Sequence, residues 1–485
     1  MSRINRAAFA AAALFAAVTL QARADDYTQV IEKKLTFHGG KVSIDHRFGH
    51  IEVRTHGGSS VDVKATVRAS DASIGRAISV TATEAAGGVS IVTHYPDTEH
   101  WSSHNGNMSY SVDYEIEMPA AAPLMIRNRF GNVDIEGLRA AGDITNAMGK
   151  VELRNTSGRQ EIENSFGSVE VRDSDGDAII RNQNGAVTVE NIKGSLDLTD
   201  RFASVRVTNA DKTVKITNSN GSVEVSDVGG TTSITNSFAG VNVRNVRGTL
   251  DVSNNNGHVE VSDVTGRTSI RNSFANVTVS NVPDVTVTSQ NARVSASGIK
   301  GPATITTSFG SIDLRDIGGP TRVRNENGNV TAVDIRNSLN VDTRFGLVKA
   351  EHIRGSADID NSNGNVTLTD VDGGARVHTS FGSVFLKDVT GAIDVDNQNG
   401  AVVVGGLASG RCHDMTLKTS FSSIKVALPG GGYNVNARTS FGRISSAYPI
   451  STMNASAESI VGAINGGGCK LDLTTANGNI SIEKE

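Results

Sequence analysis

A two-residue landmark returns at a nearly constant interval through most of the chain, and it constrains the fold more than any other feature. It is a Phe or Asn, once a Met, followed by Gly or Ala, and successive copies lie 18 residues apart except for one interval of 17. A unit of this size is too small to bury its own apolar face, so it must stack on its neighbours. The landmark residues are Phe130, Met148, Phe166, Asn184, Phe202, Asn220, Phe238, Asn256, Phe274, Asn291, Phe309, Asn327, Phe345, Asn363, Phe381 and Asn399.

Each unit has the pattern of two short strands separated by turns. Counting from the landmark, positions +3 and +5 are apolar, as at Val169 and Val171, and position +14 is apolar again, as at Ile180. Alternation with a period of two indicates a strand with one buried face. Position +10 is usually Gly, and position +7 is mostly Asp or Asn, which tolerate the left-handed backbone of a turn.

We predict an all-β fold: a single-stranded parallel β-helix, or β-solenoid, of about 18-residue coils paired into 36-residue repeats. The chain has 51 Gly and only 5% aromatic residues, which suits a narrow core of Val and Ile inside a perimeter of about 18 × 3.3 Å. The alternation of Phe and Asn leaves a 36-residue turn as the alternative. In an 18-residue coil the two residue types stack alternately at one corner, whereas in a 36-residue coil they occupy opposite edges.

A column of Asn at position +16 is predicted to point inward beside the turn. Stacked amides one strand spacing apart can form hydrogen bonds along a ladder and satisfy backbone groups of the turn. The predicted ladder consists of Asn182, Asn218, Asn236, Asn254, Asn272, Asn325, Asn361 and Asn397.

Residues 1–24 are typical of a secretory signal peptide. Arg3 and Arg6 precede an apolar run, and Ala22-Arg23-Ala24 has the pattern of a cleavage site. No later stretch is apolar enough to be a membrane helix. We therefore expect an exported protein, either periplasmic or extracellular at the cell surface.

The remainder of the chain divides into three segments. Residues 25–124 are predicted to form a β-rich N-terminal cap segment, residues 125–405 the regular solenoid, and residues 406–485 irregular C-terminal coils and a cap. The two cysteines, Cys412 and Cys469, both lie in the last segment. At about 4.8 Å per coil they would be three coils apart, about 14 Å, which is too far for a disulfide. A disulfide between them would mean that the C-terminal coils fold back.

The run "VDYEIEMPAAAPLMIRNRFGNVDIEG", from Val112 to Gly137, places an alternating strand and a Pro before the first coil. Tandem "N-G-x-V-x-V" units follow, and the chain ends in "TANGNISIEK". In these features the chain resembles the bacterial putative-adhesin family of exported β-helical domains of unknown function. The resemblance covers nearly all of the chain after residue 24 and implies a β-helical fold, but it supplies no catalytic residue.

The densest unusual chemistry lies in the segment "THYPDTEHWSSHNG". His94, Tyr95, His100, Trp101 and His104 form a candidate ligand or partner loop, in which two histidines could approach a metal and Trp101 could stack on a sugar. The alternative is a polar surface loop whose Trp covers the end of the solenoid. No strong ligand spacing is present, so we assign no metal, cofactor or catalytic residue.

The formal net charge is −5 and no block of Lys or Arg stands out, which excludes a nucleic-acid partner. We expect a non-enzymatic adhesin or cell-envelope scaffold that presents a repetitive binding surface, with a cell-surface glycan or an envelope protein as its partner. The alternative is a polysaccharide-active β-helix enzyme, a lyase or hydrolase, which needs a cluster of carboxylates and bases.

Overall fold

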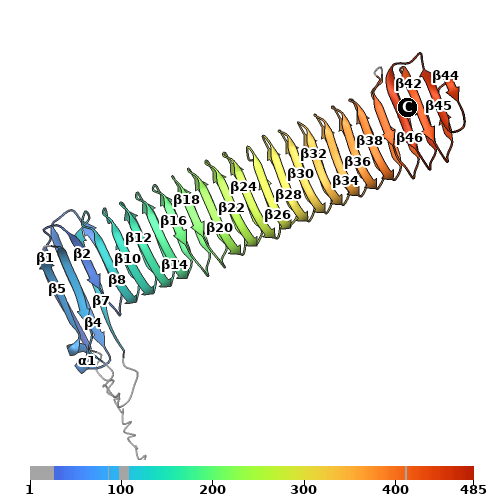
Figure 1. Ribbon diagram of the computed structural model, residues 1–485. Coiled ribbons are helices and arrows are strands. Elements are labelled where there is room, and N and C mark those ends of the chain that lie inside the picture. The colour runs from blue at the N-terminus through green and yellow to red at the C-terminus, as the bar shows by residue number, and fades with distance from the viewer. Residues whose placement is uncertain (1–26, 86, 98–108, 410–411) are drawn as a thin grey trace, which may run out of the picture.

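The computed structural model describes residues 27–485 except 86, 98–108 and 410–411. This part of the chain is almost entirely β-structure, with one six-residue helix, α1 (Ala72–Ala77), and it forms a long rod of stacked coils (Figure 1). The predicted signal peptide, residues 1–24, lies outside the described residues.

Each regular coil supplies one strand to each of two parallel sheets, which we call sheet A and sheet B. The strands of sheet A are β9 (Val133–Glu136), β11 (Val151–Thr156), β13 (Val169–Ser174), β15 (Val187–Ile192), β17 (Val205–Ala210), β19 (Val223–Val228), β21 (Val241–Val246), β23 (Val259–Val264), β25 (Val277–Ser280), β27 (Val294–Ile299), β29 (Ile312–Ile317), β31 (Val330–Ile335), β33 (Val348–Ile353), β35 (Val366–Val371), β37 (Val384–Val389) and β39 (Val402–Gly405). The strands of sheet B are β8 (Leu124–Phe130), β10 (Gly142–Met148), β12 (Gln160–Phe166), β14 (Ala178–Asn184), β16 (Leu196–Thr199), β18 (Val214–Thr217), β20 (Thr232–Phe238), β22 (Leu250–Asn256), β24 (Thr268–Phe274), β26 (Val285–Asn291), β28 (Ala303–Phe309), β30 (Thr321–Asn327), β32 (Leu339–Phe345), β34 (Ala357–Asn363), β36 (Ala375–Phe381) and β38 (Ile393–Asn399).

The register of the sheets confirms the 18-residue coil. In sheet A, Val187 pairs with Val205, and in sheet B, Phe166 pairs with Asn184, so that each strand contacts the equivalent strand one repeat away. The Phe and Asn landmarks therefore stack alternately at one corner. The 36-residue turn, which would have placed them on opposite edges, is wrong.

The core is a narrow stack of aliphatic side chains between the two sheets. In the coil of β15 and β16, Val187, Val189, Ile192, Leu196 and Leu198 are all buried. These are the +3, +5, +8, +12 and +14 positions, and each has an equivalent in the coils above and below. Because small β-branched residues fill this space, the core needs few aromatic side chains.

The two turns of each coil depend on different backbone solutions. At position +7 the chain is left-handed, with φ between 53° and 59° from Asn155 to Asp263, and Asn or Asp occupies this position in that part of the chain. At the landmark turn the following residue is often Gly. A Cβ on Gly346, where φ is +138°, would lie 2.2 Å from the carbonyl oxygen of Gly328, so Gly is required at this position. Ala239 and Ala275, by contrast, occupy the equivalent position with φ of 77° and 82°.

The predicted Asn residues at position +16 are buried beside the landmark turn. All eight donate hydrogen bonds from Nδ2 to backbone carbonyls of that turn. Asn361, for example, donates to Gly364 of its own coil and to Gly346 of the preceding coil, at 3.1 Å each. A direct bond between two amides, 3.1 Å long, joins Asn128 and Asn146 nearer the N-terminus. The amides thus tie neighbouring coils together chiefly through turn carbonyls.

We expect Asn361→Ala to lower the free energy of local unfolding by about 2 kcal/mol, because it removes two buried hydrogen bonds of about 1 kcal/mol each. Hydrogen exchange of the amides in β34 and β36 would measure the loss. Asn361→Thr is the matched control, since Thr343 and Thr379 occupy the same column in the adjacent coils. Equal protection in wild type and Asn361→Ala would contradict a stabilising role.

At the N-terminal end, the first coil of the chain is not the first coil of the stack. The strands β2 and β3 lie between the β6–β7 coil and the β8–β9 coil, pairing with both in parallel. Antiparallel strands then continue both sheets. In sheet A, β4 pairs with β7 and β1 pairs with β4, and in sheet B, β5 pairs with β6. They cover strand edges of the coils that would otherwise expose unpaired backbone. These strands are β1 (Tyr27–Thr36), β2 (Lys41–Asp45), β3 (Ile51–His56), β4 (Ser60–Ala69), β5 (Ser79–Ala85), β6 (Gly88–His94) and β7 (Tyr110–Pro119).

The C-terminal end repeats this arrangement in reverse. The last coil of the chain, β46 and β47, is inserted between the β40–β41 coil and the β42–β43 coil, and β45 and β44 close the edge of sheet B. The strands are β40 (Met415–Lys418), β41 (Ile424–Leu428), β42 (Tyr433–Thr439), β43 (Ile444–Ser446), β44 (Ile450–Ala455), β45 (Ser459–Ile464), β46 (Cys469–Thr475) and β47 (Ile480–Lys484).

This insertion corrects the expectation for the two cysteines. Cys412 and Cys469 form a disulfide, with their Cα atoms 5.6 Å apart. The distance of three coils was wrong because it assumed that coils stack in sequence order. Since β46 returns to lie beside β40, Cys469 comes into reach of Cys412, as expected if the C-terminal coils fold back.

Candidate binding ridge

The landmark corner carries a row of exposed aromatic side chains along the rod. From Phe166 to Phe381 the rings are between 47% and 58% exposed, although Phe is ordinarily a core residue. Successive rings are two coils apart, about 9.6 Å, which is beyond the centroid distances at which aromatic rings contact one another. We call this row the aromatic ridge. It comprises Phe166, Phe202, Phe238, Phe274, Phe309, Phe345, Phe381, Phe421 and Phe441, with the Asn landmarks between them.

The alternation of Phe and Asn persists in space where it fails in sequence. After Asn399 the next two landmarks in the chain are Phe421 and Phe441, but the inserted last coil places Asn477 between them. The backbone N–H of Asn477 donates to Ser420, and that of Phe441 donates to Ala476. The order along the ridge is therefore Asn399, Phe421, Asn477, Phe441. A mere relic of a duplicated 36-residue unit would not explain this order, because the unit is interrupted here.

The Asn residues between the rings are held against the scaffold. Asn184 donates from Nδ2 to the carbonyl oxygen of Ser165, which precedes Phe166 in the neighbouring coil, at 3.3 Å. Asn220 and Asn256 make the equivalent bonds to Arg201 and Ser237. These bonds fix the Asn side chains between the rings, and the exposed Phe rings recur at a regular interval.

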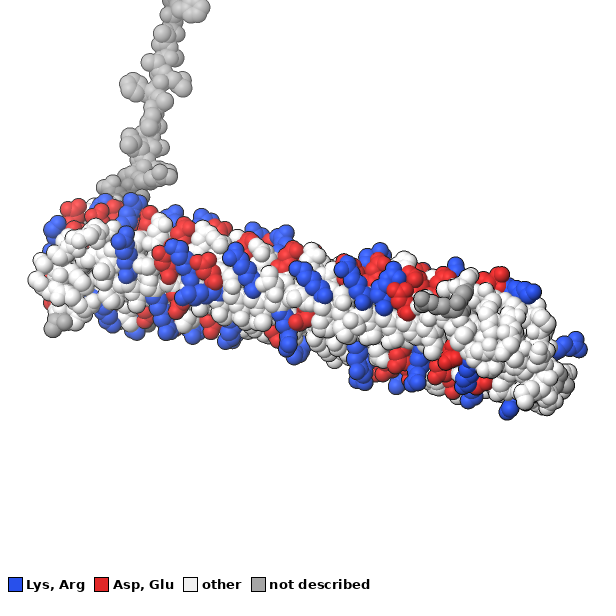
Figure 2. All heavy atoms as spheres, turned by 90° about the horizontal axis from the view of Figure 1, so that it is seen from above, with Lys and Arg blue, Asp and Glu red and all other residues white. Residues whose placement is uncertain are grey.

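The ridge is almost free of charge, unlike the rest of the surface. From Phe166 to Phe441, the landmark residue, the residue before it and the two after it include five charged side chains, Arg201, Arg293, Glu326, Arg344 and Arg443. The opposite turn is charged, and the sheet faces carry ion pairs between coils, such as Arg206–Glu224 at 2.9 Å. Figure 2 shows acidic and basic residues interspersed along the rod on the face in view. The ridge therefore offers mainly apolar surface and neutral hydrogen-bonding groups.

At its N-terminal end the ridge merges into an aromatic cluster. Phe48 and Phe130 are in adjacent coils and stack with centroids 5.1 Å apart, and Phe48 also contacts Tyr95 and Tyr110 edge to face. Tyr95 belongs to the predicted ligand loop, and Tyr110 follows that loop in sequence. The described ends of that loop therefore meet the end of the ridge.

The predicted loop residues are only partly within the described chain. His94 is exposed at the end of β6. Tyr95 is half-buried, and its hydroxyl is 3.2 Å from the backbone N and O of Phe48, which ties it to the coil. His100, Trp101 and His104 lie outside the described residues, so their role as a ligand loop stays a prediction. Within the described part of the chain, no group of three or more His, Cys, Asp or Glu side chains could hold a metal ion.

Beneath this cluster lies a buried polar network that replaces the Asn ladder. His46 occupies the ladder position of its coil, and its Nδ1 is 3.0 Å from Oγ1 of Thr93, which is 2.6 Å from the hydroxyl of Tyr114. Burial lowers the pKa of His46 to about 4 and raises the pKa of Tyr114 to about 12. His46 is therefore neutral at pH 7, and the network is a structural feature of the N-terminal coils.

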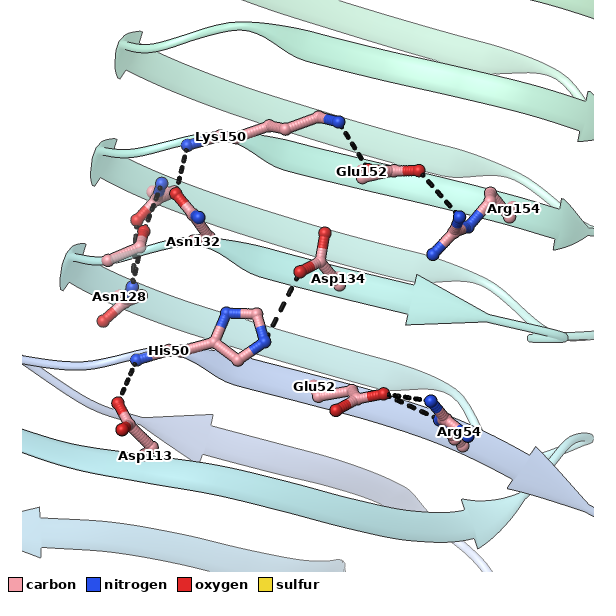
Figure 3. Close-up of polar contacts among 12 residues, drawn as sticks. His50, Glu52, Arg54, Asp113, Asn128, Asn132, Asp134, Lys150, Glu152 and Arg154 are labelled. Carbon is pink, nitrogen blue, oxygen red and sulfur yellow. Dashed lines mark hydrogen bonds and ion pairs between the residues drawn. The ribbon is translucent and has the colours of Figure 1, made fainter. Parts of the chain in front are cut away.

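A column of carboxylates crosses the outer face of sheet A near the same end (Figure 3). Register pairs Glu52 with Asp134, Asp134 with Glu152, and Glu152 with Glu170. Lys150 lies 2.5 Å from Glu152 and 2.7 Å from Glu170. The hydrogen bond from Lys150 holds the pKa of Glu152 below its usual range, whereas burial raises the pKa of Asp134.

Carboxylates and bases gather, as a polysaccharide enzyme needs, both in this column and in a cavity lined by Asp358, Asp360, Asp394, Asp396, Arg376 and His378. The column is the cluster that lies nearest the N-terminal coils. Its members are engaged in ion pairs, with Arg154 at 3.2 Å from Glu152 and His50 at 3.4 Å from Asp134. Sequence reasoning missed it, because Glu52 reaches the column only through the out-of-order insertion of β3.

Sequence reasoning also missed the aromatic ridge as a candidate site. The Phe landmarks were recognised as markers of alternate coils, and their period of 36 residues was the signal that could have identified them. The core does not need these rings, since Val and Ile fill it, and the strand pattern alone does not show that the chain turns outward at this corner.

The fold is thus a parallel β-solenoid, as expected of a β-helical domain of the adhesin family that the sequence resembles. No family model matches the chain, and neither does any curated protein, so membership of that family stays a prediction. Among solved structures, the chain is similar to a putative cell adhesion protein from Clostridium sporogenes, with 11% sequence identity over 47% of this chain and 100% of that chain and a TM-score of 0.18. We draw nothing about function from so low a TM-score. No helix among the described residues is long and apolar enough to span a membrane.

Proposed function

We propose that the protein is an exported, non-enzymatic β-solenoid that serves as an adhesion-type binding surface or scaffold of the cell envelope. The observation that carries this proposal is the aromatic ridge, nine Phe side chains exposed in a row on a rigid rod. Regularly spaced weak contacts multiply into strong binding when the partner engages several of them at once. A stack of tied coils provides that regular spacing at little cost in conformational entropy.

One further observation supports export. A disulfide joins the only two cysteines, and disulfides persist mainly in oxidising compartments outside the cytoplasm. The ends of the stack are closed by antiparallel strands, which protects a long solenoid from joining others end to end. The disulfide suits a protein that works outside the cytoplasm, whereas the closed ends serve a long solenoid in any compartment.

Replacing Phe202, Phe238 and Phe274 together by Ser tests the proposal. We expect binding of the labelled protein to bacterial envelope fragments and to a panel of immobilised cell-surface glycans to fall about tenfold or more, because three consecutive contacts are lost. The fold should persist, since these rings are half-exposed.

The matched control replaces Lys193, Lys212 and Arg247, at the opposite turn of neighbouring coils, by Ser. This variant should bind like the wild type. Equal binding by the ridge variant and the control would show that the ridge is not the binding surface.

The carboxylate column favours the second candidate, a polysaccharide-active enzyme. That function predicts depolymerisation of a polysaccharide by the purified protein and its loss in Glu152→Gln. Depolymerisation that is lost in Glu152→Gln would show that the protein is an enzyme and would contradict the scaffold proposal. If the polysaccharide keeps its length, the ion pairs of the column have a structural role.

A further inference from the structure

The periodicity and chemistry of the aromatic ridge define what can lie on it. We infer that the ridge binds a linear, neutral, β-1,4-linked glycan that runs parallel to the long axis of the rod, with one sugar face stacked on each Phe. This inference rests on the proposed function and names the partner class of the same surface.

The first argument is the match of periods. Successive sugars of a β-1,4-linked chain are flipped relative to each other, so the same face recurs at every second sugar. On the ridge the same ring recurs at every second coil, about 9.6 Å apart, a distance close to two sugars of an extended chain. Over several successive coils, each Phe would then meet an equivalent sugar face.

The second argument is the chemistry between the rings. A sugar has apolar C–H faces and hydroxyl edges, and an aromatic ring offers a flat apolar partner for such a face. The Asn rows and the flanking Ser residues offer neutral hydrogen-bonding groups at the height of the intervening sugar. Asn184, Asn220 and Asn256 are already held by bonds to the backbone, so their ordering on binding costs little.

The third argument is charge. At the ridge positions from Phe166 to Phe441 the charged side chains are Arg201, Arg293, Glu326, Arg344 and Arg443. The four arginines are three or more coils apart, so the surface lacks the continuous row of cations that would complement a polyanion such as polygalacturonate or a nucleic acid. Self-association of two chains is favoured by a continuous apolar patch on each. On the ridge, the apolar rings are separated by polar rows, so a second copy of the chain is a poorer fit. A neutral glycan has the same alternation of apolar and polar groups.

The fourth argument is the preserved alternation at the C-terminal end. Placing Asn477 between Phe421 and Phe441 keeps the two-coil period to the end of the rod. A ligand that lies along the ridge requires that Phe and Asn alternate in space, whatever the order of the coils in the sequence. The inserted coil provides this spatial alternation.

The experiment changes the order of Phe and Asn along the ridge while the remaining coils stay intact. Deleting residues 239–256 removes one coil and makes Phe238 and Phe274 neighbours, whereas deleting residues 221–256 removes two coils and keeps the alternation. A point-variant pair guards against misfolding of the deletions: exchanging residue types in Phe238→Asn/Asn256→Phe moves one ring by one coil without changing length or composition. Far-ultraviolet circular dichroism would confirm that each variant is folded.

Binding would be measured by calorimetry with β-1,4-linked gluco- and manno-oligosaccharides of increasing length, and with oligogalacturonate as the anionic comparison. We expect the dissociation constant to fall with each added pair of sugars. The anionic oligogalacturonate should have the highest dissociation constant of the three glycans. The one-coil deletion and the exchange variant should weaken binding of long oligosaccharides about tenfold, and the two-coil deletion much less.

Equal affinity of the one-coil and two-coil deletions, or preference for oligogalacturonate, would overturn the inference. Concentration-dependent dimers that are lost in the Phe→Ser variant, without glycan binding, would make the ridge a self-association surface and overturn it as well. Loss of envelope binding in the Phe→Ser variant without any glycan binding would overturn the glycan while leaving the proposed function in place.

Discussion

Replacing Cys412 and Cys469 by Ser is expected to lower the free energy of unfolding of the C-terminal coils by about 4 kcal/mol. The disulfide closes a segment with a sequence separation of 57 residues, and the chain-entropy relation gives a stabilisation of this size for such a loop. The effect should be local, because each coil of a solenoid contacts only its neighbours. Hydrogen exchange resolved along the chain would show the loss of protection in β40 to β47 and little change in β20 to β24.

The location of this disulfide explains why the loss should be large. Cys469 begins β46, the strand that is inserted between β40 and β42, and the disulfide joins it to the segment that precedes β40. At the other end of the inserted coil, the carboxylate of Glu485 accepts hydrogen bonds from the backbone of Gly406 and Leu407. The covalent bond therefore holds in place the coil that carries Asn477.

A single Cys469→Ser variant, which leaves Cys412 as a free thiol, separates the bond from the loss of two side chains. It should behave like the double variant, and reduction of the wild type by dithiothreitol should have the same effect. Full protection of β46 and β47 after reduction would show that the inserted coil does not depend on the disulfide.

The regular part of the fold could be predicted because each coil repeats the same local rules. Period-two alternation identifies the strands, Asp173 and its equivalents identify the left-handed turn, and the stacking of Val and Ile columns fixes the coil at 18 residues. Such patterns act through neighbours in sequence or one coil away, so they can be read directly from the residues.

The order of the coils at the two ends could not be predicted in this way. Every coil presents the same kind of strand edge, so no local pattern specifies that β46 pairs with β40 rather than with β44. The disulfide and the carboxylate column both depend on that order, and so does the place of Asn477 in the ridge. The exposure of the Phe rings depends on the direction of the chain at the corner, where the strand alternation ends.

The pH dependence of the N-terminal coils is expected to come from His46. Burial lowers its pKa from 6.5 to about 4 in the folded chain, so the unfolded chain binds the additional proton between these two values. Its contribution is therefore complete above pH 6.5 and is lost as the pH falls towards 4. The shift corresponds to about 3 kcal/mol of local stability, at about 1.4 kcal/mol per pKa unit.

The groups around the ring explain why protonation is costly. Thr93, Tyr95 and Tyr114 surround it with hydroxyls and aromatic faces. Hydrogen bonding to the backbone of Val112 and the charge of Asp113 offset the burial only in part. The ring of His46 is buried, so a positive charge on it would be held away from water. Protonation should therefore loosen β2, the strand that precedes it, and expose the stacked pair of Phe48 and Phe130.

The matched variant is His46→Asn, which gives this coil the residue that the ladder uses elsewhere, as at Asn128 and Asn146. Hydrogen exchange of β2 and β3 at pH 7 and pH 4.5, corrected for the intrinsic exchange rates, should show a loss of protection in the wild type and a much smaller one in this variant. Replacing the exposed His258 by Gln should leave the pH dependence unchanged. If the wild type and His46→Asn lost the same protection at pH 4.5, the carboxylates of the neighbouring sheet A column, rather than His46, would account for acid sensitivity at this end of the rod.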